Sequence, residues 1–315
     1  MRPIKFFFTG MRRFCSSKSD KLKLLRDITG APLMKCKEAL DKFATIEEAK
    51  AFLREKNLVM ADKKAGNAAT EGVLGLSVQP GKIIVSKVNS ETDFVAKNEE
   101  FLNFVQETVK TIDQHSGHLK TGQNELTPEI LSNFKTSQDD LLERQKMITA
   151  KIQENIKISE SFLDTFDPSH IAGTYIHRAL RPNVGTSLGY VIVEQNGPAP
   201  RVAVEEVAND LAVHIFCKSP TYVSFDTIPK DIIEQTTNQI KASLKEDKTF
   251  DKKPKDIQEK IFDGKIKKAF DDEILTEQIA DFWDSEKTVG DYLKDFERRH
   301  STKVKVIRFN SLKIK

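Results

Sequence analysis

The sequence predicts an α+β fold with an N-terminal three-helix module, a two-part core of small antiparallel sheets packed with helices, and a coiled-coil-like helical hairpin. Three observations lead to this. Apolar residues recur at helical spacing over residues 20–60, hairpin patterns followed by amphipathic helices occur twice downstream, and two further helices share a short polar connection within residues 229–270. The length of 315 residues, 31% of them charged, is typical of a globular chain of roughly two domains.

Residues 1–19 differ in composition from the rest of the chain. They contain five basic residues and no acidic one, because the first carboxylate is Asp20. A basic, acid-free, amphipathic start is typical of a mitochondrial presequence, and the apolar run Ile4–Phe8 is too short for a secretory signal. The alternative is a basic tail without a targeting role. We expect a presequence and a location in the mitochondrial matrix.

Residues 20–60 predict three short helices. A Thr-Gly-Ala-Pro stretch ends the first helix, since glycine and proline both interrupt helical structure. Thr45 followed by Glu48 predicts a capping box at the start of the third helix. Residues 61–72 are small and polar, which indicates a linker that is partly helical.

The core pattern of a hairpin and then a helix appears twice. Residues 73–165 contain two β-rich runs around Gln79-Pro80-Gly81, then an amphipathic helix, a polar stretch at 115–128 read as a loop, and a helix near 141–152. Residues 166–228 repeat the hairpin and the helix with little identity. Residues 229–270 interrupt this second part with the helical hairpin, and residues 271–315 complete it with a helix and a last strand.

No catalytic constellation stands out. The chain has no Walker A loop, GxGxxG, HExxH or GxSxG motif, and its three cysteines are too far apart for a disulfide framework or a zinc site. Cys36 and His214 lie on apolar helix faces and are predicted to be core residues. A net charge of +3 gives no overall polycation, and no run of about 18 apolar residues exists. We expect no enzymatic activity, metal, cofactor, membrane span or direct nucleic-acid binding.

The stretch VNSETDFVAKNEEF, residues 88–101, joins a predicted strand to a predicted helix. On one interpretation Ser90 caps the helix, Asp93 completes a capping box, and Phe94 packs in the core on the same face as Phe101. On the other, a carboxylate and a ring project from a rigid helix start into a partner. The second half has Glu194-Gln195-Asn196-Gly197-Pro198 at the equivalent junction, so the fold unit does not require the Asp-Phe pair. The residues alone leave both open.

Several ordered motifs resemble the elongation factor Ts family, and with the presequence its mitochondrial form. Residues 25–40 (LRDITGAPLMKCKEAL) are similar to the family's LRxxTGAGMMDCKKAL, and the stretch 88–101 is similar to its most specific motif. KKAGNAATEG, KPKDIQEKIFDGKIKK, TVGDYL and IRF match further blocks in order, so that the similarity runs from about Leu22 to Phe309.

The resemblance implies a nucleotide exchange factor for mitochondrial elongation factor Tu. In the family, the Asp-Phe pair inserts near the switch region of the GTPase, the ring separates partner helices, and the partner's magnesium site is disrupted. Carried over, Phe94 is the wedge, Asp93 is its polar companion, and Thr92 and Val95 belong to the same binding motif.

The resemblance also implies secondary contacts. The N-terminal module resembles a ubiquitin-associated three-helix domain that docks on the GTPase, with Leu33 and Met34 at the position of an exposed apolar pair; their alternative is the bundle core. His177 matches a histidine that faces the partner, and Phe282 and Trp283 match an apolar contact pair. The hairpin within 229–270 mediates dimerisation in some members. The turn at 178–185 is longer and poorer in glycine than the family's.

Two other functions compete with exchange. The chain could hold the GTPase without releasing nucleotide, as a chaperone-like partner would. It could also be an RNA-binding translation protein, although the basic spots at Lys63-Lys64 and Lys265–Lys268 are typical of solvated helix faces.

Overall fold

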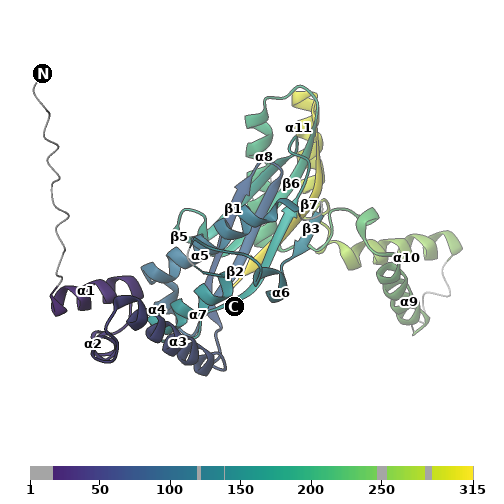
Figure 1. Ribbon diagram of the computed structural model, residues 1–315. Helices are drawn as coiled ribbons and strands as arrows, with labels where there is room; N and C mark the ends of the chain where they lie inside the picture. Colours follow the sequence, from purple (N-terminus) through teal and green to yellow (C-terminus); the bar gives the residue numbers. More distant parts are fainter. Residues whose placement is uncertain (1–16, 119–121, 138, 247–253, 281–285, 315) are drawn as a thin grey trace, which may run out of the picture.

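The computed structural model describes residues 17–118, 122–137, 139–246, 254–280 and 286–314 (Figure 1). In this part of the chain, helices surround one antiparallel sheet, which confirms the α+β class. The helices are α1 Lys18–Thr29, α2 Leu33–Lys42, α3 Ile46–Lys64, α4 Asp93–Ala96, α5 Glu99–His115, α6 Pro128–Leu131, α7 Leu141–Ile152, α8 Arg201–Lys218, α9 Lys230–Glu246, α10 Lys255–Phe270 and α11 Val289–His300. The strands are β1 Glu71–Gln79, β2 Lys82–Ser90, β3 Gly122–Glu125, β4 Lys157–Thr165, β5 Ile171–Arg181, β6 Val184–Asn196 and β7 Lys303–Lys313.

The N-terminal module consists of α1, α2 and α3 around a small core. Leu25, Cys36 and Leu53 are buried in that core, as predicted for Cys36. Thr45 and Glu48 form the expected reciprocal capping box at the start of α3. The third helix continues to Lys64, so only residues 65–70 separate it from β1. The likeness to a ubiquitin-associated domain stays a prediction.

The sheet has two halves that share a short junction. Its order is β3-β4-β2-β1-β6-β5, and β7 pairs with β6. Between the halves, β1 pairs with β6 only at Leu74↔Gly185 and Gly75↔Val184. The separate small sheets that the sequence predicts are therefore the two halves of one continuous sheet. The polar stretch read as a loop is partly ordered, because β3 pairs there with β4.

Alternating side chains on the strands build three apolar clusters. The first packs between β1, β2 and helix α5, and the second between the other half of the sheet and helices α8 and α11. The third joins the halves, since it combines Leu74 and Ile83 of the first with Leu188 and Ile192 of the second. Each half therefore has its own helical cover, and both halves share a central apolar layer.

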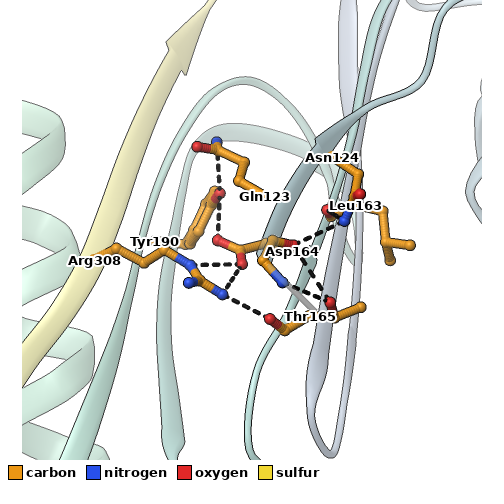
Figure 2. A network of polar contacts seen from close by, with 8 residues as sticks. Gln123, Asn124, Leu163, Asp164, Thr165, Tyr190 and Arg308 are labelled. Carbon is orange, nitrogen blue, oxygen red and sulfur yellow. Dashed lines mark hydrogen bonds and ion pairs between the residues drawn. The ribbon is translucent and has the colours of Figure 1, made fainter. Parts of the chain in front are cut away.

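A buried polar network reinforces this shared layer (Figure 2). Arg308 of β7 donates from Nε to Oδ1 of the buried Asp164 at 2.7 Å and from Nη2 to the Thr165 carbonyl at 2.7 Å. Tyr190 of β6 donates its hydroxyl to Asp164 Oδ2 at 3.2 Å. Burial, and then the charge of Asp164, raises the pKa of Tyr190 well above its usual range. The network thus fastens β4 of one half to β6 and β7 of the other.

Two helical units lie at opposite ends of the molecule (Figure 1). The N-terminal module packs through α3 against α7, where Arg54 pairs with Asp139 and Glu143 at 2.7 Å each. The predicted helical hairpin is present as α9 and α10, and its base packs around Phe270 and Ile274. Among the described helices, none combines the length and the apolar character needed to cross a membrane.

Candidate partner-binding site

The candidate site is a short helical turn between β2 and α5. Thr92 caps this turn by accepting a hydrogen bond from the Val95 N–H at 3.4 Å. Val95 and Ala96 are buried against the first apolar cluster, whereas the side chain of Phe94 is 80% exposed. The turn therefore has an anchored inner side and presents Asp93 and Phe94 to solvent. We call residues 92–97 the wedge turn.

The interpretation of Asp93 and Phe94 as a cap and a core residue is wrong. Ser90 is the last residue of β2 and donates its hydroxyl to the Thr92 carbonyl at 2.9 Å, so it does not cap the helix. A separate cap, Asn98, begins α5 and accepts from the Glu100 N–H at 2.9 Å. Phe94 and Phe101 therefore lie on different helices, and only Phe101 is buried.

Two carboxylates at the turn are held in their ionised form by hydrogen bonds. Asp93 Oδ2 accepts a hydrogen bond from Lys97 Nζ at 2.8 Å, and this bond holds the pKa of Asp93 below its usual range. The backbone N–H of Asn155, donating at 2.5 Å, lowers the pKa of Glu91 in the same way. Both carboxylates are therefore ionised at neutral pH. An exposed carboxylate beside an exposed ring gives the turn one polar and one apolar contact.

Sequence reasoning missed two residues that support the turn. Glu154 accepts hydrogen bonds from the backbone N–H of Thr92 at 3.1 Å and from its hydroxyl at 3.0 Å. Asn155 bonds to Glu91 and to the segment before β1. Both follow α7, about sixty residues away in the chain, and no local pattern marks them as partners of the wedge turn.

The apolar pair in the N-terminal module is on the surface. Leu33 is 50% exposed and Met34 is 73% exposed at the start of α2, so neither belongs to the bundle core. Met34 is among the most exposed large hydrophobic side chains in the described part of the chain. The pair and Phe94 are therefore separate exposed apolar contacts on different units.

His177 lies in β5 on an aromatic support. Its ring stacks on Phe216 of α8 with centroids 4.9 Å apart, and its Nδ1 lies 3.2 Å from the Tyr175 hydroxyl. The strand continues beyond it to Arg181, with a β-bulge before the tight turn into β6. Phe282 and Trp283 lie outside the described residues.

The remaining candidate for chemistry is a core residue. His214 is fully buried in α8 and its Nε2 lies 2.9 Å from Gln278 Oε1, which confirms the prediction of a packed histidine. Within the described ranges, no group of three or more histidine, cysteine, aspartate or glutamate residues is placed to hold a metal ion.

An exposed ring on an anchored turn, and an adjacent apolar pair at a helix start, are contacts that a partner protein would bury. The fold and this site therefore offer separate apolar contacts for a partner protein on two different units. Phe94 projects from a turn whose next two residues, Val95 and Ala96, are buried.

Comparison with known proteins gives the family. The family model described as elongation factor TS matches residues 91–314. Elongation factor Ts of Rickettsia felis is 31% identical over 296 residues, covering 91% of this chain and 88% of that protein. Elongation factor Ts of Francisella tularensis subsp. novicida is 35% identical over 265 residues, covering 84% and 82%. The chain belongs to the elongation factor Ts family, a family of translation elongation factors.

Proposed function

We propose that this protein is the nucleotide exchange factor of mitochondrial elongation factor Tu, and that it acts by binding and not as an enzyme. Family membership implies elongation factor Tu as the partner and nucleotide exchange during translation elongation as the activity. The observation that carries the mechanism is the wedge turn, which holds a ring that is 80% exposed on a backbone whose neighbouring residues are buried.

In the proposed mechanism, Phe94 enters the GTPase near the nucleotide phosphates and separates partner helices. Mg²⁺ bridges phosphate oxygens and partner side chains in a demanding octahedral geometry. A small displacement of these ligands therefore weakens the binding of Mg²⁺, and the loss of Mg²⁺ weakens the binding of GDP. Asp93 adds a carboxylate, which opposes the negative phosphates. Because binding free energies are linked, the exchange protein and GDP must weaken each other's binding to the GTPase by the same ratio.

Leu33, Met34 and His177 supply docking contacts away from the nucleotide in this proposal. The exposure of Leu33 and Met34 supports it, since two adjacent apolar side chains on a helix start form a compact contact. Phe282 and Trp283 keep their proposed role from the family motif alone.

The test is release of a fluorescent GDP analogue from purified mitochondrial elongation factor Tu. The predicted boundary after residue 19 cuts into α1, which begins at Lys18 with Ser17 as its cap, so the protein tested starts at Ser17. Residues 17–315 should accelerate release, Phe94→Ala should abolish the acceleration, and Val202→Ala should leave it unchanged. Val202 is the matched control, because it is an apolar residue that is 63% exposed on the other half of the core.

The outcomes separate the rival functions. Binding without accelerated release by the wild type would indicate a GTPase-holding partner. Wild-type acceleration that Phe94→Ala retains would overturn the wedge. Binding to RNA with a steep salt dependence, in the absence of the GTPase, would favour the RNA-binding alternative.

The location is proposed from composition. The five basic residues and the missing carboxylates of residues 1–19 support a mitochondrial presequence. A fluorescent protein fused behind residues 1–30 should enter the matrix and be shortened there. Cytosolic fluorescence would contradict this assignment.

Self-association through residues 229–270 is the last part of the proposal. Ile257 of α10 is 46% exposed on the projecting hairpin, which gives a second copy an apolar contact. Sedimentation velocity should show a dimer that Ile257→Lys dissociates. If the wild-type protein is monomeric at every concentration, the proposed dimerisation is wrong.

A further inference from the structure

The wedge turn is too short to hold its own shape. Its helix α4 has four residues, and a helical turn of this length is not stable by itself because nucleation is unfavourable. The exposed Asp93–Lys97 pair adds little, since both side chains are more than half exposed. The orientation of Phe94 must therefore depend on contacts from other segments.

Glu154 provides the strongest of these contacts. One carboxylate receives both polar hydrogens of Thr92, from the backbone at 3.1 Å and from the hydroxyl at 3.0 Å. Thr92 is also the cap of α4, so this bond fixes the residue from which the helical turn begins. Glu154 follows Gln153, whose φ of 67° ends α7 in a left-handed conformation and directs the chain towards the wedge turn.

Asn155 connects the same region to the N-terminal module. Its side-chain amide, which is largely buried, donates to the carbonyl of Asn67 at 2.7 Å and to that of Ala65 at 3.3 Å. Asn67 in turn donates to Glu91 at 2.9 Å, and Glu91 also accepts the backbone N–H of Asn155. The segment after α3, the start of the wedge turn and the end of α7 thus form one hydrogen-bonded unit.

The other end of α7 is bound to the same module. Arg54 of α3 pairs with Glu143 of α7 at 2.7 Å, and Lys146 of α7 pairs with Asp62 of α3 at 2.7 Å. Helix α7 therefore contacts the N-terminal module along its length and supports the wedge turn at its C-terminal end.

We propose that Glu154 and Asn155 are positioning residues that fix the wedge turn relative to the N-terminal module, so that a partner docked on the module meets Phe94 in one orientation. This proposal rests on the exchange function proposed above. Neither residue touches the partner in this account. Their effect is on the maximal rate of nucleotide release and not on docking.

The first experiment measures GDP release against factor concentration for Glu154→Ala. The maximal rate should fall about tenfold, a change of about 1.4 kcal/mol in the barrier, while the half-saturating concentration changes less than twofold. Glu154→Gln should recover most of the rate, because its amide oxygen still accepts from the Thr92 N–H. Glu160→Ala is the matched control, since Glu160 is an exposed glutamate on β4 that pairs only with Lys87 among the described contacts.

A double variant tests whether Glu154 acts through Thr92. Thr92→Val removes the hydroxyl that donates a hydrogen bond to Glu154. Combining it with Glu154→Ala should therefore slow release by less than the product of the two single effects. Full multiplication of the effects would show that Glu154 acts independently of Thr92, which would overturn the proposal.

Hydrogen exchange provides a readout that does not depend on catalysis of release. In the free Glu154→Ala protein, the amides of residues 92–97 should exchange at least tenfold faster, while those of α8 keep their protection. Unchanged protection of residues 92–97 would overturn the positioning role even if release is slow. If the wild type does not accelerate release at all, the proposed function fails, and the hydrogen-exchange arm still decides the role of Glu154.

Discussion

The two strand-to-helix junctions of the core, after β2 and after β6, have different structures. After β2, the chain inserts the extra turn of α4, which projects Phe94 into solvent. After β6, it bends at Gly197, and the Ala199 N–H donates to Thr302 Oγ1 at 2.8 Å, so that this junction lies against the molecule. The difference shows that a hairpin followed by a helix requires only a compact connector. The exposed ring is an addition to the fold unit and is better explained by binding.

Removing the Arg308–Asp164 pair, which joins the two halves of the sheet, should have the largest effect on the free energy of unfolding. Arg308→Met leaves Asp164 buried with Tyr190 as its main partner, and loss of one member of a buried pair typically costs about 3–5 kcal/mol. Urea unfolding should show a loss of this size. Lys305→Met on the same strand, whose pair with Glu194 is exposed at 4.0 Å, should change stability by less than about 0.5 kcal/mol. Equal effects would mean that the network does not join the halves.

The junction after β6, which lies against the molecule, should not tolerate a side chain at Gly197. Gly197 has φ of 146°, and a Cβ there would meet the Ser301 carbonyl oxygen and Thr302 Oγ1 at 2.5 Å each. Gly197→Ala should destabilise the fold by about 2–3 kcal/mol through clash and backbone strain. Thermal unfolding measures this, and a neutral result would show that the second junction is as loosely held as the tip of the first.

The shared layer also predicts a dependence of stability on alkaline pH. Burial raises the pKa of Tyr190, so above about pH 10 the unfolded state ionises this phenol while the folded state keeps it neutral. The unfolded state then binds fewer protons, and stability falls as pH rises, by up to about 1.4 kcal/mol per pH unit. Tyr190→Phe should reduce this slope, whereas stability near pH 7 reflects only the lost hydrogen bond. If the slope of stability against pH is unchanged in Tyr190→Phe, the pH dependence comes from other groups, such as Tyr292.

A substitution at the exposed tip of the junction after β2 should have the smallest effect on stability. Because Phe94 is mostly in solvent, Phe94→Ala should alter the free energy of unfolding by less than about 0.5 kcal/mol. Denaturant unfolding of both proteins checks this. A loss of about 3 kcal/mol or more, which is typical of truncating a buried aromatic side chain, would show that Phe94 packs in the core.

Sequence reasoning predicted the regular elements well, because their signals are local. The Thr45–Glu48 capping box and the hairpin around Gly81 depend on residues that are neighbours in the chain. One of the two sequence interpretations began the helix at Ser90, two residues before the actual cap Thr92, because both residues have cap chemistry; in the structure Ser90 is paired with Glu71 at the end of β2. That shift separates Phe94 from the helix of Phe101.

The parts that could not be predicted depend on distant contacts. Strand β3 is polar and short, and it forms because β4 offers an edge for pairing. Glu154 and Asn155 follow a helix end with no recognisable motif, and their role appears only when the fold brings them to Thr92 and Asn67. The partnership of Asp164 with Arg308 spans both halves of the core in the same way.

The most direct test of the central claim is the affinity of the protein for elongation factor Tu in its nucleotide-free and GDP-bound forms. If Phe94 opposes the nucleotide, the wild type should bind the nucleotide-free form far more tightly, and Phe94→Ala should bring the two dissociation constants together with little change in binding to the GDP-bound form. A variant that keeps the full wild-type ratio of affinities would contradict the account, because the coupling between factor and nucleotide would then reside elsewhere.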